Sequence, residues 1–146
     1  MHDFLNPDRI VIGIRKNSQQ KVEVKEKLLS LFEQFDCQKI VVDTQTAELI
    51  KYAANAFLAT KISFINEIAN VCERVGADVN DVAHAVGLDQ RIGREFLRAG
   101  LGYGGSCFPK DVRALDQIAG KSGYDFKLLK SVIEVNQAQR LHIIEK

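Results

Sequence analysis

The stretch from Thr44 to Val75, TQTAELIKYAANAFLATKISFINEIANVCERV, contains neither glycine nor proline. Its apolar side chains recur around most of a helical projection, Thr44 or Thr46 can cap its start, and Gly76 can end it. One uninterrupted helix of this length would span roughly 45 Å, whereas helices in globular proteins average about 11–12 residues. A helix that is apolar on most sides has to be covered on several sides. The stretch therefore predicts a mainly helical fold built on one long helix, with a second copy of the chain as part of its cover.

Before this helix, the sequence predicts a strand, a helix and a second strand. RIVIGI at Arg9–Ile14 and KIVV at Lys39–Val42 are short, apolar and β-branched, as buried strands are. Val22–Phe35 between them has apolar residues at helical spacing. The two strands of such a βαβ unit are parallel. Two strands and one helix cannot cover both faces of a parallel sheet. We therefore expect residues 1–42 to be the C-terminal part of a Rossmann-type α/β domain, and residues 43–146 to be a central helical domain.

Further helices are expected after the long one. Asp78 or Asn80 can cap a short helix that ends at Gly87, and the charged segment REFLRA also has a helix-like composition. Pro109 favours the first turn of another helix, which runs to about Ala119. Asp125 can cap a last helix that continues towards the end of the chain.

The composition is that of an ordinary globular protein and excludes several classes of function. A formal net charge of +1 offers no basic surface for nucleic acid. No apolar run approaches the ~18 residues of a membrane-spanning helix, and the first residues lack the regions of a signal peptide. We therefore expect a cytoplasmic protein with no nucleic-acid or membrane partner. The cysteines form no CxxC pair and the histidines lack metal-ligand spacing, so neither a disulfide framework nor a metal site is expected.

The most unusual segment is the glycine loop, GYGGSCFPKD at Gly102–Asp111. It places Cys107 just before an expected helix start, where unpaired N–H groups and the helix dipole favour an anion. Lys110 lies nearby, so both features favour the nucleophilic thiolate. On these grounds Cys107 is either a nucleophile or a small structural residue, whereas Cys37 and Cys72 are expected to be buried hydrophobes.

The glycine loop also overlaps a literal G-x-G-x-x-G match, GLGYGG, at Gly100–Gly105. A dinucleotide-binding fingerprint needs a strand immediately before it and a βαβ unit around it. The preceding REFLRA does not have the composition of a strand, and no Lys-Ser/Thr pair follows as in a P-loop. We therefore do not expect a dinucleotide to bind through these glycines.

Three motifs in order carry a resemblance to a known family: AELIKYAANAFLATKISFINEIANVCE, GLDQRIG and GYGGSCFPKD. Together they resemble the nucleotide-sugar 6-dehydrogenases of the UDP-glucose/GDP-mannose dehydrogenase family, over nearly the whole chain. The resemblance implies an NAD-binding Rossmann domain, a central helical domain that forms a homodimer, and a domain that binds the nucleotide sugar. Such enzymes oxidise the C6 alcohol of the sugar to a carboxylate with two NAD, through a cysteine thiohemiacetal and thioester, for polysaccharide biosynthesis.

The resemblance leaves three alternatives for the function. Tyr103 and Phe108 in the glycine loop favour UDP-glucose as substrate, with UDP-glucuronate as product. The first alternative is the same reaction with GDP-mannose or UDP-N-acetylmannosamine as substrate. The second alternative is that the protein is no enzyme but a helical dimerisation module. Because the family's NAD fingerprint does not occur in this chain, the chain alone is expected to be inactive.

The resemblance also implies a role for individual residues. Cys107 matches the nucleophile, Lys51 the lysine that stabilises oxyanion charge at C6, Asn55 the asparagine that orients the reacting oxygen, and Asp111 the aspartate that activates water. Matches to substrate-binding positions are Arg91, which reaches the partner's site, and Phe96, Gly102, Tyr103, Gly104 and Gly105. Lys110 matches a cofactor-binding position.

These assignments carry a geometric expectation. Lys51 and Asn55 are four residues apart, so on a helix they share one face. A lysine and an asparagine on an otherwise apolar helix need polar partners, because burying either alone costs about 1–3 kcal/mol or more. We expect the glycine loop to fold over this face, with Cys107 and Asp111 near both residues and Arg91 far away in its own chain.

Overall fold

The structure is a computed structural model that describes residues 5–17 and 19–145. The chain divides into two compact units, residues 1–51 and residues 52–146, so each unit is described by itself. The division falls inside the long helix. The expected domain boundary after residue 42 stays a prediction.

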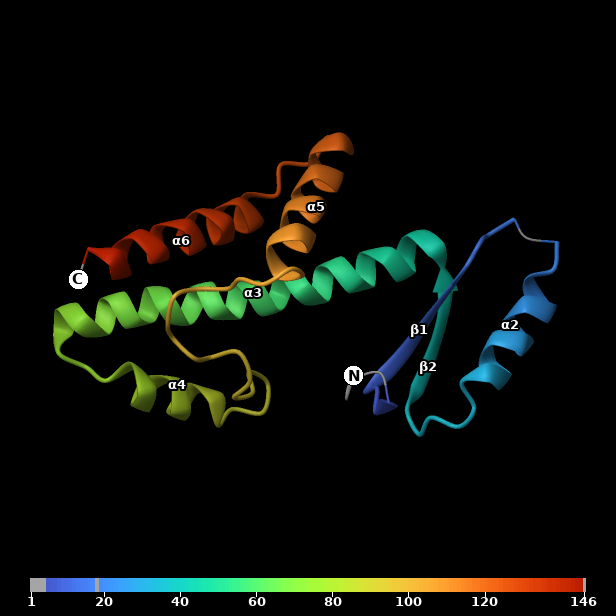
Figure 1. The fold of residues 1–146 in the computed structure, drawn as a ribbon, viewed down its shortest axis with the longest axis horizontal. Coiled ribbons are helices and arrows are strands. Elements are labelled where there is room, and N and C mark those ends of the chain that lie inside the picture. Colours follow the sequence, from blue (N-terminus) through green and yellow to red (C-terminus); the bar gives the residue numbers. More distant parts are fainter. Residues whose placement is uncertain (1–4, 18, 146) are drawn as a thin grey trace. The chain divides into compact units, whose positions relative to one another are not determined.

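The first unit contains strand β1 (Arg9–Ile14), helix α2 (Lys21–Leu31) and strand β2 (Gln38–Asp43). The strands are parallel, and their pairing runs from Arg9 with Gln38 to Ile14 with Asp43. The predicted parallel βαβ unit is therefore confirmed, with β2 one residue longer at each end than its apolar run. Figure 1 shows α2 as the connection between the two strands.

Helix α2 is shorter than expected, since the prediction carried it to Phe35. The N–H groups of Phe32 and Glu33 donate to the carbonyls of Leu29 and Ser30, three residues back. Bonds of this kind tighten the chain at the end of an α-helix. The apolar spacing that suggested a longer helix comes from Phe32 and Phe35, whose rings lie 6.2 Å apart in the turns that follow.

Helix α3 (Thr44–Val75) has the bounds that the sequence predicts. Gly76, with φ +75°, ends it as expected. The capping prediction is wrong, because the carboxylate of Asp43 accepts hydrogen bonds from the Thr46 N–H at 3.0 Å and from the Thr46 hydroxyl at 2.9 Å. An aspartate one residue earlier thus satisfies a donor that the helix start leaves open. The pKa of Asp43 is lowered, first by the backbone hydrogen bond from Thr46.

In the second unit, α4 (Val79–Gly87), α5 (Phe108–Lys121) and α6 (Lys127–Ile144) accompany the main part of α3 (Figure 1). Asp78 caps α4, since its carboxylate accepts the N–H of Asn80 at 2.7 Å. Asp125 does not cap α6, contrary to expectation; Phe126 occupies the capping position. The segment from residue 88 to residue 107 consists of turns and irregular chain, so the helix suggested by REFLRA does not form.

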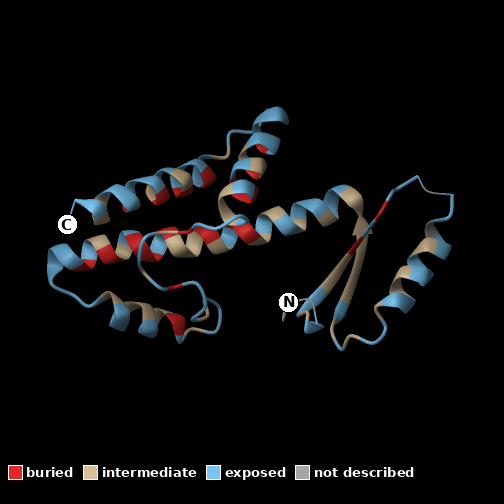
Figure 2. Cartoon of the chain, viewed as in Figure 1, coloured by how far each residue is buried: buried red, intermediate tan, exposed pale blue. Residues whose placement is uncertain are grey.

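The core of the second unit lies where α3, α5, α6 and the glycine loop meet. Buried residues gather in the middle of α3 and along one side of α5 and of α6 (Figure 2). The main buried cluster consists of Ala56, Ala59, Tyr103, Val112, Leu115, Leu129 and Val132. Within this cluster, α3 contributes the small side chains of Ala56 and Ala59, which allow the neighbouring helices to approach closely.

Some large apolar residues of α3 lie on the outside of this unit, although Ile65 is buried. Phe57, Phe64 and Val71 are spaced by seven residues and are 65%, 52% and 51% exposed. Residues at this spacing form one stripe along a helix. The described helices include none that is long and apolar enough to cross a membrane. The cytoplasmic location expected from the sequence stays a prediction.

Candidate active site

A buried hydrogen bond joins α3 to the start of α5. The Asn55 side-chain amide donates to the Asp111 carboxylate at 2.6 Å. Both residues are almost fully buried, with 7% and 2% of their surfaces exposed. Burying a carboxylate is costly unless it accepts hydrogen bonds, so this pair is a strong local constraint. The expected approach of Asp111 to the Asn55 face of α3 is therefore found.

Lys110 contacts the carboxylate from the solvent side. Its ammonium lies 2.5 Å from the second oxygen of Asp111, while the lysine side chain itself stays 69% exposed. The hydrogen bond to Asp111, and then the charge of Asp111, raise the pKa of Lys110 above its ordinary value. Asp111 thus lies between a buried amide and an exposed cation.

Cys107 occupies the capping position of α5 and is exposed. In the part of the chain that the structure describes, its side chain makes no hydrogen bond to the N–H groups of the first turn of α5. The Ser106 hydroxyl lies 3.7 Å from its sulfur. The thiol is therefore at the positive end of a helix and open to solvent, next to Lys110 and Asp111 in the first turn. Cys72 is buried, as expected, whereas the prediction of a buried Cys37 is wrong, because Cys37 lies in the irregular chain after α2 and is half-buried.

The glycine loop crosses the core side of the second unit before it reaches Cys107. Tyr103 is 5% exposed, and burial is the main reason why its pKa is raised. Its ring lies 6.2 Å from that of Phe108, which in turn lies 6.2 Å from Phe96 in an edge-to-face arrangement. Gly102 and Gly105 have φ values of +92° and +74°, a conformation that glycine adopts without strain. Gly104 does not share this conformation.

Arg91 lies on an exposed turn rather than in this cluster of contacts. Its guanidinium donates to the Asp89 carboxylate at 2.6 Å and 3.0 Å. The backbone N–H of Arg91 donates to the same carboxylate. The bond from Arg91 lowers the pKa of Asp89. Lys61 of α3 supports this turn by donating to the carbonyl of Ile92 at 3.0 Å. Asp89 in the same turn therefore holds the Arg91 side chain, and α3 supports the backbone of the turn.

Lys51 is an exposed residue of α3, one helical turn before Asn55. It closes the first compact unit, whereas Asn55 and Cys107 belong to the second. The predicted approach of the Lys51 ammonium to the Cys107 sulfur stays a prediction.

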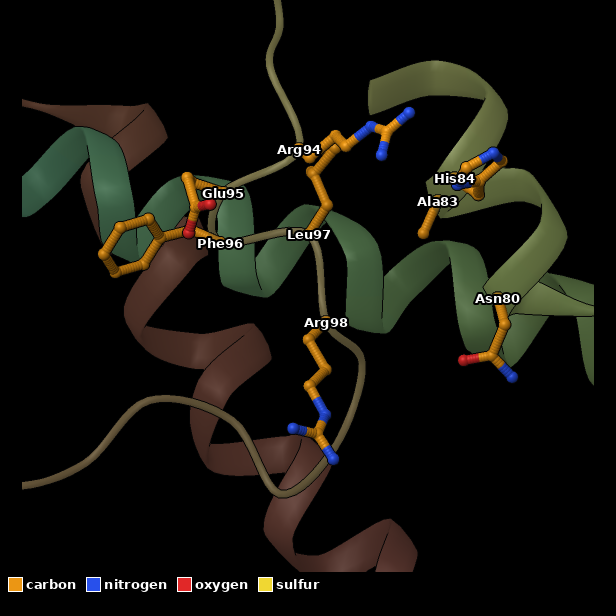
Figure 3. A pocket seen from close by; sticks show the side chains of 8 residues that line it. All are labelled: Asn80, Ala83, His84, Arg94, Glu95, Phe96, Leu97 and Arg98. Atoms are coloured by element: carbon orange, nitrogen blue, oxygen red, sulfur yellow. The ribbon is translucent and has the colours of Figure 1, made fainter. Parts of the chain in front are cut away.

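A cleft of about 310 Å³ lies beside Phe96 (Figure 3). Phe96 itself has φ +65°, an unusual conformation for a bulky residue. Figure 3 shows Arg94 and Arg98 extending to opposite sides of the segment that carries Phe96. The lining residues are Asn80, Ala83, His84, Arg94, Glu95, Phe96, Leu97 and Arg98. The sequence prediction did not single out the two arginines, although RIGREFLR already shows the repeated basic residues.

Comparison with known proteins gives consistent matches. Residues 45–138 match the model of the UDP-glucose/GDP-mannose dehydrogenase family, central domain. The whole chain is 58% identical to 31% of UDP-glucose 6-dehydrogenase TuaD of Bacillus subtilis, and 47% identical to 32% of a UDP-glucose 6-dehydrogenase of Rickettsia felis. The chain thus spans about a third of the length of these relatives.

Solved structures show the same likeness. A UDP-glucose dehydrogenase from the hyperthermophilic archaeon Pyrobaculum islandicum superposes with a TM-score of 0.87 at 44% identity, over 94% of this chain and 31% of that one. A GDP-mannose dehydrogenase from Pseudomonas aeruginosa gives a TM-score of 0.57 at 32% identity, over the same shares of the two chains.

Proposed function

Because the chain belongs to the UDP-glucose/GDP-mannose dehydrogenase family, we propose that it supplies the thiol-bearing part of a nucleotide-sugar 6-dehydrogenase site. The observation that carries this proposal is the buried Asn55–Asp111 hydrogen bond, which ties the long helix to the turn that begins at the exposed Cys107. Carboxylate, amide and thiol are thereby held at one helix start, as acyl chemistry on a thiol requires.

The proposed reaction oxidises the C6 alcohol of UDP-glucose to the carboxylate of UDP-glucuronate. The Cys107 thiolate adds to the C6 aldehyde left by the first oxidation, and the resulting thiohemiacetal loses a second hydride to become a thioester. Water then hydrolyses the thioester, which yields the carboxylate and returns the thiol. When bound, NAD would accept the hydride of each of the two oxidations, and each oxidation also releases a proton.

The other residues act on the oxygen atoms around C6. Asn55 orients the reacting oxygen, Lys51 stabilises negative charge that develops on it, and Asp111 activates the water of hydrolysis. The buried hydrogen bond between Asn55 and Asp111 supports these roles, because an amide and a carboxylate that are already fixed need little reorganisation during the reaction. Arg91 serves the site of the partner subunit.

The described residues fit only a small part of an NAD site. The literal G-x-G-x-x-G segment follows turns rather than a strand, so it does not form a dinucleotide-binding βαβ unit. Lys110 is the cofactor contact that the family resemblance suggests. Its ammonium carries three donors, one of which points to Asp111, so it can also contact a phosphate.

We also propose that the active form is a homodimer in which the stripe of Phe57, Phe64 and Val71 packs against a second copy of the chain. The support is the exposure of these large apolar side chains along one line of a long helix. A second copy carries the same stripe, which suits a two-fold interface.

A chimera tests the catalytic proposal. The matched segment of TuaD from B. subtilis is replaced by this chain, and NADH formation from UDP-glucose is measured. We expect turnover, and we expect Cys107→Ser to reduce it by about three orders of magnitude because the covalent intermediate cannot form. Cys37→Ala is the matched control, with turnover like that of the unaltered chimera. This chain alone is expected to form no NADH.

The outcomes separate the alternatives. A Cys107→Ser chimera that keeps its full rate shows that Cys107 is not the nucleophile. Turnover of GDP-mannose or UDP-N-acetylmannosamine in place of UDP-glucose changes the substrate but not the chemistry. A folded, dimeric chimera that oxidises none of the three supports the helical dimerisation module.

A further inference from the structure

Five polar side-chain contacts hold the backbone of Gly100, just before the glycine loop, and of Tyr103 inside it. At Gly100, the N–H donates to the Asn66 side chain at 2.8 Å, and the carbonyl accepts from Gln139 at 3.1 Å. At Tyr103, the carbonyl accepts from Arg140 at 2.9 Å. The remaining two contacts come from Asn136, a buried residue of α6.

Asn136 binds both backbone groups of Tyr103. Its side-chain oxygen accepts the Tyr103 N–H at 2.7 Å, and its amide donates to the Tyr103 carbonyl at 3.1 Å. An asparagine carries an acceptor and two donors, so this arrangement satisfies both backbone groups at once. Asn136 is only 5% exposed, and such a buried pair leaves the loop little freedom in this register.

Gly102 shows how closely the loop approaches Asn136. A Cβ placed on Gly102 would lie 2.3 Å from the Asn136 side-chain oxygen, much closer than real contacts allow. The positive φ of Gly102 is a second reason why only glycine fits there. The loop conformation and the Asn136 side chain are therefore matched to each other.

A chain of contacts leads from Asn136 to Cys107. Asn136 fixes the Tyr103 backbone, the buried Tyr103 ring contacts Phe108, and Phe108 is the first residue of α5, directly after Cys107. We propose that Asn136 is a positioning residue for Cys107, which holds the glycine loop so that the thiol stays at the start of α5. Only the catalytic consequence rests on the function proposed above.

The first test measures the thiol itself in this 146-residue chain. The alkylation rate of Cys107 by iodoacetamide is followed by peptide mass spectrometry near neutral pH, for the wild type and for Asn136→Leu. Leucine is close in size but cannot bind the backbone. We expect the rate to fall at least about threefold, because a displaced thiol no longer lies at the N-terminus of α5.

Ser63→Ala is the matched control. The buried Ser63 hydroxyl donates to the Val132 carbonyl at 3.3 Å, so it also joins α3 to α6 but does not touch the loop. We expect it to leave the alkylation rate unchanged. A merely structural role of Asn136 would lower the melting temperature of Asn136→Leu and leave the alkylation rate at the wild-type value. That result would overturn the proposal.

A pair of substitutions keeps the proposal testable if Asn136→Leu does not fold. Gly102→Ala puts a methyl group against the Asn136 oxygen, and Asn136→Ala removes that oxygen. We expect Gly102→Ala to lower the alkylation rate by a smaller factor in the Asn136→Ala background than in the wild type, because only the backbone strain remains. If Gly102→Ala lowers the alkylation rate by the same factor in both backgrounds, the proposed fit between Gly102 and the Asn136 side chain is contradicted.

The catalytic consequence is measured in the TuaD chimera. We expect Asn136→Leu to lower kcat about tenfold or more with KM changed less than about twofold, since a misplaced nucleophile slows the chemistry more than it weakens binding. A kcat that stays unchanged would overturn the catalytic consequence. If the unaltered chimera is inactive, the proposed function fails, whereas the alkylation rates still decide whether Asn136 positions the thiol.

Discussion

Asp111 is the residue on which the candidate site depends most. It is buried, it lies in the first turn of α5 close after Cys107, and it accepts hydrogen bonds from one residue in the core and one at the surface. A carboxylate near the N-terminus of a helix is favourable in itself. The additional contacts make its position specific, because each of the two oxygens has a different partner.

The contact between Lys110 and Asp111 predicts a dependence of stability on pH. The pKa of Lys110 is raised in the folded protein, first by its hydrogen bond to Asp111. The contribution to the free energy of unfolding is therefore fully present below the ordinary lysine pKa of about 10.4 and is lost as the pH rises through the raised value. We expect the difference in urea midpoint between wild type and Lys110→Met to shrink over this range.

Urea unfolding at pH values between about 8 and 12 measures that difference. Every other titratable group is present in both proteins, so the comparison isolates the contribution of Lys110. A difference that stays constant to the highest pH would show that the charge of Lys110 does not stabilise the fold. An increase with pH would contradict the sign derived above.

At the scale of the elements, α3 shows an unusual distribution of side chains. Its core side carries alanines together with the buried polar residues Asn55, Ser63 and Asn66, while its phenylalanines at 57 and 64 are exposed. The polar residues on the core side bind α5, α6 and the backbone of Gly100 just before the glycine loop. Hydrogen bonds from this helix thus arrange the site within the second unit. Its largest apolar side chains, the two phenylalanines, remain exposed.

The glycine loop is the second decisive element, and two neighbouring glycines in it should respond differently to substitution. Gly105 has φ +74°, so Gly105→Ala is expected to cost about 1–2 kcal/mol of unfolding free energy. Gly104 lacks this conformation, and a Cβ on it would meet its nearest neighbour, Arg140, at 3.8 Å. We expect Gly104→Ala to be neutral or to stabilise by up to about 1 kcal/mol.

Chemical unfolding of the two variants checks this prediction, with each glycine serving as the control for the other. Equal costs would indicate that the loop relaxes after either substitution. A larger cost at Gly104 would contradict the backbone conformation described for the loop.

For the whole molecule, the exposed stripe on α3 predicts its assembly. We expect the chain to be a dimer at micromolar concentration and Phe64→Asp to be a monomer, because a charge in the middle of an apolar interface is costly to bury. Ala138→Asp is the matched control, since position 138 is exposed on α6 and lies outside the stripe. Sedimentation velocity distinguishes the two states. A wild type that stays monomeric would refute the predicted homodimer.

Much of the fold follows from local sequence alone. The bounds of α3, the parallel strands around α2 and the start of α5 near Cys107 are all predicted, because they depend on apolar spacing, β-branched residues, and the positions of glycine and proline. Details at helix ends were missed where a neighbouring group competes. Asp43, rather than a threonine, caps α3, and Asp125 does not cap α6.

The motifs likewise determined the family and the identity of the candidate residues, since Cys107, Asn55 and Asp111 stand in segments that resemble it. Only the tertiary structure decided which of these residues meet. The Asn55–Asp111 bond joins positions 56 residues apart, and Asn136 binds a loop 33 residues before it. No local pattern encodes such contacts, because the partner of a buried polar group is set by the packing of helices against one another.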